Sequence, residues 1–508
     1  MKTQKILIVF MVWVSFMWSG CGSDSSSSPV VQDSVERVKA DLESKGFLVQ
    51  EGDLFFFRLE DKWQMPLYYG NNPTSPYGFY RLPPGPGEPN TDVEIFPWDR
   101  DIDNFAKRSL WRLRPDEALV FIGKTPPECI YFGFRTYLFD RYLMVDGQPQ
   151  LKDIFASLGD TANNLTMKTS STYEYPGIDP YEKQTILIST ADRGTEALVR
   201  KALIENGYPE KIINTGIIPG LDNEAHGFAP LLNMGYGEDA DIFTMLIRVA
   251  LFSDADAGQQ YMSAQSARIL RVTPMNAPPL ETYTLPNLRE SGTGTTEIPL
   301  EDSLLNLVEG VRKANQGPNR VIIETREGIL PIQGPECIRG SHFCFGDNHD
   351  AQYIVYPIEK ILATGEGFRI VKDNDDFILV VGVISSYTGK ATYVNITPYY
   401  MVKQLGLVSM TGDMLIGSAD RYIPDDPNRD FLYVAKIARN CAPNGVAEPH
   451  CVEVPTCTDD PMKVFPCAPL DVDLFIMNRV YLEPVTACQP TPDEILMPFF
   501  LHVRPLGS

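Results

Sequence analysis

The sequence predicts an α+β protein with a strand-rich, two-part body and a few amphipathic helices. Disulfide bonds are expected to link the two parts. Apolar runs rich in β-branched and aromatic residues alternate with turn residues, which is typical of strands. Few segments show the longer apolar spacing of an amphipathic helix. The cysteines concentrate in the second half of the chain. An apolar content of 44% is that of a globular protein with a substantial core.

In the first half, apolar residues at helical spacing between 31 and 42 predict a helix that Gly46 is placed to end. A second helix opens at Thr190-Ala191-Asp192 and reaches Asn206. With the strands on either side of it, this helix forms an expected strand–helix–strand unit. The strands expected in this half are 54–59, 118–122, 129–139, 185–189 and 211–218.

Proline, glycine and threonine concentrate between 274 and 299, and we place a connection between two domains at 286–299. This predicts an N-terminal α+β domain at 31–285 and a C-terminal, strand-rich and cysteine-rich domain at 300–508. In the second domain a helix is expected at 301–314. The strands expected there are 321–325, 377–385, 392–397, 414–416 and 431–437.

Residues 1–20 have the layout of a secretory signal peptide, with two lysines ahead of an apolar run at 6–18. A helix that spans a bilayer needs about 20 apolar residues, so this run is short for a span. The motif Ser19-Gly20-Cys21 resembles the lipobox of bacterial lipoproteins. The resemblance implies that Cys21 is lipidated and becomes the mature N-terminus. An ordinary secretory signal with an incidental cysteine is the alternative.

A serine-rich stretch follows the cysteine, so residues 21–30 would form the lipidated tether of the body. The resemblance then implies an exported protein that is anchored by lipid to the bacterial cell envelope, at the outer membrane, with the membrane as its partner. The net charge of −22 disfavours nucleic acid, because an acidic surface repels phosphate. The same negative charge is also typical of a protein surface whose charge serves solubility alone.

Cysteine usage predicts disulfide bonds. With Cys21 assigned to lipid, an even number of cysteines remains in a chain that we expect to be exported. Matching intervals suggest two local loops among the last five cysteines. Cys129 lies before the connection and would have to bridge to the second half. Zinc is the competing interpretation, but no Cys-x-x-Cys pair occurs. The expected disulfide cysteines are Cys129, Cys337, Cys344, Cys441, Cys451, Cys457, Cys467 and Cys488.

The segment 336–350 gathers histidines, carboxylates and cysteines. Imidazole and carboxylate together suit a divalent metal with an open position for water, and His342, Asp347 and His349 are the candidate ligands. Asp350 joins them as a catalytic candidate. Two other interpretations stay open: a disulfide-pinned loop whose polar side chains cap turns, and a Cys344 nucleophile beside His342.

Aromatic residues crowd the stretch 55–80, where rings in loops could form a platform for a ligand. Trp63, Tyr68 and Tyr69 are the candidate ligand-binding residues there. Arg135 alternates with tyrosines along an expected strand and would anchor an anion if its face lines a cavity. Strand residues that fill the core are the alternative for the three aromatic residues, and an Arg135 that faces water would have no role in function.

Two functions follow from these features. The first is an exported, lipid-anchored envelope protein that binds a ligand or a partner without turnover. The second is a metal-assisted hydrolase centred on 336–350, which would use a divalent metal as its cofactor. The sequence contains no Walker motif, dinucleotide fingerprint or Gly-x-Ser-x-Gly elbow, so ATP, NAD and the common esterase layout lack support.

Overall fold

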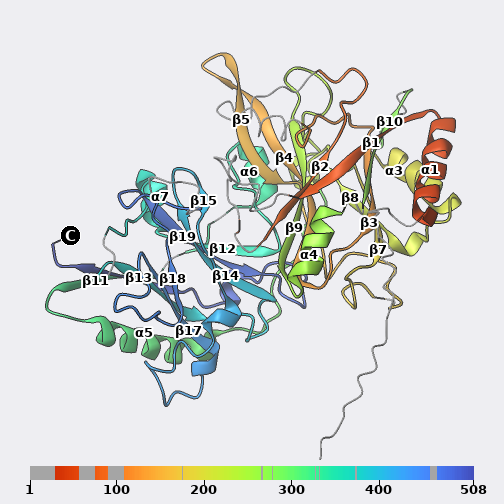
Figure 1. The fold of residues 1–508 in the computed structure, drawn as a ribbon. Helices are drawn as coiled ribbons and strands as arrows, with labels where there is room; N and C mark the ends of the chain where they lie inside the picture. Colours follow the sequence, from red (N-terminus) through yellow and green to blue (C-terminus); the bar gives the residue numbers. More distant parts are fainter. Residues whose placement is uncertain are drawn as a thin grey trace, which may run out of the picture.

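A computed structural model of the chain describes residues 29–56, 72, 75–89, 108–173, 175–264, 267–276, 279–326, 328–330, 332–371, 375–457 and 466–507. Within these ranges it is a mixed, strand-rich α+β protein with disulfides, as the sequence predicts. Figure 1 shows the first half of the chain, red to green, on one side and most of the second half, green through cyan to blue, on the other. No helix in the described ranges has the length and apolar character that crossing a membrane would require.

The described strands of the first half belong to one 10-stranded sheet, in the order β5-β4-β9-β2-β1-β10-β3-β7-β8 with β6 paired to β4. Most neighbours are antiparallel, and β7 and β8 are parallel. The strands are β1 (Phe47–Phe56), β2 (Tyr77–Arg81), β3 (Ala118–Lys124), β4 (Cys129–Val145), β5 (Gln148–Ser157), β6 (Ala162–Asn163), β7 (Gln184–Thr190), β8 (Ile213–Ile217), β9 (Ile242–Phe252) and β10 (Arg268–Pro274).

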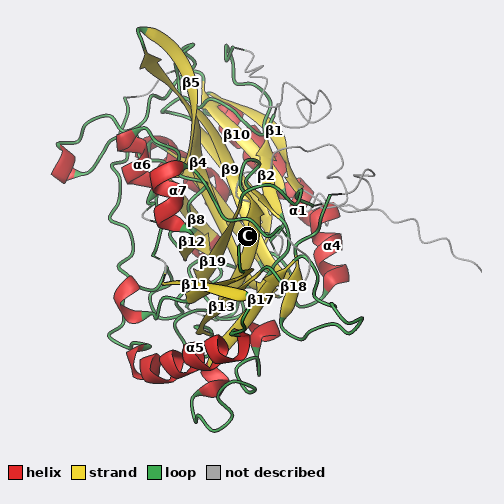
Figure 2. Cartoon of the chain, turned by 90° about the vertical axis from the view of Figure 1, so that its left-hand side faces the viewer, coloured by secondary structure: helices red, strands yellow, loops and turns green. Residues whose placement is uncertain are grey.

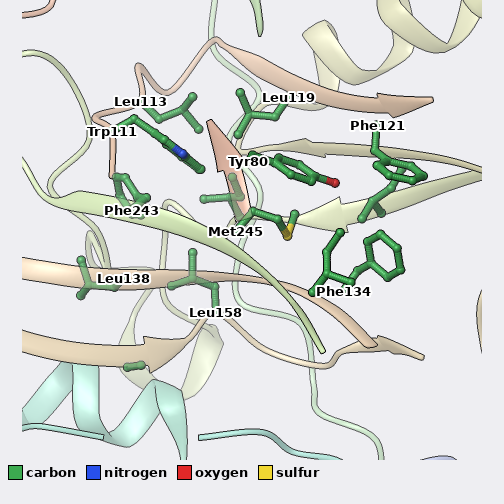
Figure 3. Close-up of a cluster of buried hydrophobic side chains, with 14 of the residues drawn as sticks. Tyr80, Trp111, Leu113, Leu119, Phe121, Phe134, Leu138, Leu158, Phe243 and Met245 are labelled. Atoms are coloured by element: carbon green, nitrogen blue, oxygen red, sulfur yellow. The ribbon is translucent and has the colours of Figure 1, made fainter. Parts of the chain in front are cut away.

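This sheet curls around an aromatic core. Strands β3 and β4 stand far apart in the sheet order, yet the rings of Phe121 on β3 and Phe134 on β4 meet edge to face with centroids 5.2 Å apart. Tyr80 stacks near Phe121, and Trp111 packs on Phe243. Figure 3 shows these side chains pointing into the space that the strands enclose. Burial of large rings stabilises this half.

The other face of the same sheet is covered by α1 (Pro29–Ser44) and α3 (Arg193–Glu205), while α4 (Ala255–Ser263) contacts β1 and β9. Alternate residues of β3 therefore enter different cores, as the period of two of a strand requires. Asp192 caps α3 by accepting from the Thr195 amide. Both expected helices and the parallel β7-α3-β8 unit are confirmed.

The second half contains two further sheets, ordered β11-β20-β13-β17-β18 and β12-β19-β14-β15 with β16 paired to β14. Apolar residues from both sheets meet in one core, so the sheets pack face to face. The strands are β11 (Arg320–Arg326), β12 (Ala351–Tyr356), β13 (Phe377–Val383), β14 (Tyr393–Tyr400), β15 (Leu405–Gly406), β16 (Met410–Thr411), β17 (Leu432–Ala438), β18 (Cys451–Glu453), β19 (Leu474–Tyr481) and β20 (Phe499–Pro505).

Helix α5 (Glu301–Asn315) covers the outer face of the β13 sheet with its apolar stripe. Figure 2 shows α5 at the end of the molecule opposite β5. Two shorter helices, α6 (Gly334–Gly340) and α7 (Ile358–Thr364), flank β12 in the sequence. The strand expected at 414–416 is wrong, because a 3-10 helix at Gly412–Leu415 occupies this place after β16.

The two halves meet through the β12-β19-β14 sheet, which packs against β4 and β9 of the first half. The expected connection at 286–299 lies against both halves. Arg289 donates from its main chain to the Asp160 carboxylate at 2.8 Å and from its guanidinium to Thr161. Further along, the Thr293 amide donates to Glu494 at 2.9 Å. The connection is therefore a packed part of the structure.

The disulfide prediction is confirmed for three pairs: Cys337–Cys344, Cys441–Cys451 and Cys457–Cys467. It is wrong for Cys129 and Cys488, which are buried free thiols. Cys129 sits in the aromatic core of the first half, where burial raises its pKa to about 12. The sulfur of Cys488 lies 3.6 Å from the Glu290 carbonyl oxygen. The halves are joined by packing and hydrogen bonds instead.

Candidate functional site

The 336–350 segment starts in α6 and runs along the edge of the first-half sheet. The Cys337–Cys344 disulfide closes its first turn, and both cysteines lie in the first-half core. The Cys344 amide donates to the Ile154 carbonyl at 2.7 Å, and the Gly346 amide donates to Phe155. Main-chain hydrogen bonds thus attach this segment of the second half to β5.

Asp347 is fully enclosed in this segment. Its carboxylate accepts from the Ser157 amide and hydroxyl, both at 2.7 Å, and from the Gly334 amide at 2.8 Å. Burial raises the pKa of Asp347, and these donors counteract part of the shift. Because both oxygens already accept hydrogen bonds from main-chain or hydroxyl donors, the carboxylate is a structural acceptor that joins three parts of the chain.

The remaining candidates of the segment have separate partners. His349 Nδ1 lies 2.6 Å from an Asp160 oxygen. Asp350 accepts from Tyr131 Oη at 2.9 Å and from Asn163 Nδ2 at 3.0 Å, and burial raises its pKa to about 6. His342 follows α6, with its ring beside Gly340.

The expected metal site is therefore wrong for this segment. In the described ranges no three His, Cys, Asp or Glu side chains come together as metal ligands, and this holds for His342, Asp347 and His349. A Cys344 nucleophile is wrong as well, because that sulfur is in a disulfide. The structure supports the remaining alternative, a disulfide-pinned loop. Asp347, His349 and Asp350 are each paired with first-half residues, so the segment helps to hold the halves together.

The expected anion anchor Arg135 is buried and is held by carbonyls. It donates to the Asp160 oxygen at 3.0 Å and to the Ile217 oxygen at 3.3 Å. Burial lowers its pKa to about 10, against the opposing charge of Asp160. It supports the loop around Gly159, and it lines neither of the two cavities described below. The other proposed ligand-binding residues lie outside the described residues: Trp63, Tyr68 and Tyr69.

A groove of about 780 Å³ runs beside β12. This volume is in the range of ligand-binding pockets, roughly 300–1,000 Å³. Apolar side chains and three glutamines wall it, and the amides of glutamine both donate and accept hydrogen bonds. Its one lining carboxylate, on Glu336, is ion-paired with Arg339 at 2.7 Å. The lining includes Ile329, Leu330, Gln333, Gln352, Gln489 and Met497.

A second, much smaller cavity of about 20 Å³ lies where the two halves meet. Arg248 on β9 and Arg479 on β19 both line it, and we call it the Arg248–Arg479 cavity. Each arginine has a tyrosine directly across the strand pair, Tyr77 beside Arg248 and Tyr353 beside Arg479. It shares the Tyr353 wall with the groove.

Sequence reasoning missed both arginines. The signal is present in retrospect: each is a charged residue inside an otherwise apolar, strand-like run, at 242–252 and 474–481. A charge within a strand that is buried on both faces must be paired, liganded or functional. Neither run is among the strands that the sequence predicts.

No protein-family model matches this chain, and no curated protein matches it. Among solved structures, the VPA0106 protein from Vibrio parahaemolyticus is similar at 10% identity, with a TM-score of 0.36 over 95% of this chain and 100% of that chain. An uncharacterised protein from Burkholderia cenocepacia is similar at 11% identity, with a TM-score of 0.35 over 95% of this chain and 91% of that chain. TM-scores this low do not indicate a shared fold or a shared function.

Proposed function

We propose that this chain is an exported, lipid-anchored protein of the bacterial envelope that binds a ligand without turnover. The observation that carries the binding role is the groove beside β12. Its amide and apolar walls suit a neutral ligand with several hydrogen-bonding groups, such as a sugar or a peptide. The proposal of binding without turnover is supported by the ion-paired state of Glu336.

The anchor rests on the leader and on Cys21, which lie outside the described residues. Two or more acyl chains hold a protein stably on a membrane, whereas one gives reversible binding. We expect the mature protein to begin at Cys21 with a mass increased by lipid, and to remain with the membrane fraction. A Cys21→Ala variant should lose both properties. Release of the wild-type protein with an unmodified Cys21 would contradict the anchor.

The groove is tested by thermal unfolding of the purified protein with a panel of sugars, short peptides and aromatic acids. A ligand that binds the native state raises the midpoint as its concentration increases. Gln333→Ala should reduce the response, because Gln333 is an exposed lining residue. Gln259→Ala is the matched control, since Gln259 is exposed on α4 away from the groove. No shift with any member of the panel would count against the binding role.

A further inference from the structure

The Arg248–Arg479 cavity places two guanidinium groups in a dry environment. Arg248 is 4% exposed and Arg479 is 2% exposed. Their strands come from opposite halves of the chain. Tyrosine rings line the space between them, and the wall is completed by apolar side chains and by Gln404. Solvation by bulk water therefore contributes little to either charge.

The hydrogen bonds of the two arginines are incomplete. Arg248 donates to the Tyr137 hydroxyl and, at 2.6 Å, to the Gly346 carbonyl. Arg479 donates from one terminal nitrogen to the Tyr399 hydroxyl at 2.5 Å. Its other terminal nitrogen, Nη1, is buried with no hydrogen-bond partner among the described residues. Gln404 lines the same cavity, and its Oε1 is also buried without a hydrogen-bond partner, so the lining residues carry unpaired polar atoms that a bound group would satisfy.

The charges near the cavity do not balance. Asp347 interacts electrostatically with Arg248, but its carboxylate oxygens already accept hydrogen bonds from Ser157 and Gly334. The phenols stay neutral, since burial raises the pKa of both Tyr137 and Tyr399. Among the described residues neither Arg248 nor Arg479 forms an ion pair with a carboxylate, which leaves positive charge at the cavity without a direct counter-ion. An uncompensated buried charge is strongly destabilising.

We propose that the Arg248–Arg479 cavity binds one small monovalent anion of about the size of a halide. The charge of such an anion offsets the excess positive charge, and Arg479 Nη1 supplies a charged donor. The volume of about 20 Å³ is small, which favours a compact anion. A water molecule in the same place would accept the hydrogen bond but leave the charge unbalanced.

Because each half contributes one arginine, the anion stabilises the contact between the halves. Its binding adds to the stability of the native state by mass action. The anion site is inferred from the residues that line the cavity, and this inference does not depend on a ligand in the groove. A negative result with the sugar and peptide panel would therefore not contradict the anion site. A negative result with the anions would likewise not contradict a ligand in the groove.

The test measures thermal unfolding of the full chain while chloride, bromide or formate replaces gluconate at constant ionic strength. We expect a saturable rise of the midpoint with the small anions and none with sulfate. Arg479→Met should weaken the apparent affinity roughly tenfold or more, as expected for loss of a charged donor. Arg369→Met is the matched control, because Arg369 is exposed and ion-paired only at the surface with Asp473.

A crystal grown or soaked in bromide supplies a measurement that does not depend on any variant. The expected result is an anomalous peak between the guanidinium groups of Arg248 and Arg479. Three results would overturn the proposal: no anomalous peak at the cavity, a rise of the midpoint with sulfate equal to the rise with the halides, or an unchanged halide response in a folded Arg479→Met variant. If that variant does not fold, the bromide crystal decides.

Discussion

Replacing Asp347 should separate a structural carboxylate from a metal ligand. In Asp347→Ala the Ser157 and Gly334 amides, now 2.7 Å and 2.8 Å from an acceptor, lose it inside the protein. A buried donor left without a partner costs about 1–3 kcal/mol, so two of them cost about 2–6 kcal/mol. The Ser157 hydroxyl adds less, because it rotates toward other acceptors.

The assay is urea unfolding at pH 7.5, followed by near-UV circular dichroism. Asp347→Asn should destabilise less than Asp347→Ala, because it keeps one acceptor oxygen while its amide group faces a donor. Asp425→Ala is the matched control, since Asp425 is exposed. Surface substitutions of this kind usually change stability by less than about 0.5 kcal/mol.

Two results would refute this reasoning. The first is an Asp347→Ala protein as stable as the Asp425→Ala control. The second is a wild-type protein that loses several kcal/mol of stability on chelation of metal, while Asp347→Ala is insensitive to the chelator. That pattern would indicate that the Asp347 carboxylate binds a metal ion.

Three further predictions concern the same region and the thiols. The pKa of Asp350 is raised to about 6 in the folded state, so its contribution to stability is fully present below about pH 4 and is lost as the pH rises through about 6. Urea titrations should show a loss of about 3 kcal/mol across that window, and the loss should be absent in Asp350→Asn. Replacing both Cys337 and Cys344 by serine should cost about 2–3 kcal/mol, and dithiothreitol should then have a smaller effect on the variant than on the wild type. Maleimide labelling of the unreduced, denatured protein should modify Cys129 and Cys488, whereas protection of both would show that they are bonded.

Local patterns in the sequence predict local structure well. The apolar stripes of α1 and α5 and the cap of α3 are set by residues within a few turns of one another, and all three helices occur as expected. The Cys441–Cys451 and Cys457–Cys467 loops are short enough for spacing to indicate them. The pairing of Cys129 was inferred from an even count alone, and a count carries no information on distance.

The order of the strands could not be predicted. Strand β1 pairs with β10, and β4 pairs with β9, across more than a hundred residues of chain. Such partners are chosen by tertiary packing, because many apolar strands of similar length are compatible with one another. Asp347, His349 and Asp350 are close in the sequence, yet folding brings each one to a different partner in the first half.

The Arg248–Arg479 cavity shows the opposite case. Its two arginines are separated by most of the second half of the chain, and each one alone is only a charge within an apolar strand. A buried charge indicates that a partner must exist, but its identity depends on which strands face each other. Here the facing strand carries a second arginine where a carboxylate would have neutralised the first. Two like charges that fold toward one cavity require a third, opposite charge, and this requirement makes an anion the ligand that best fits the cavity.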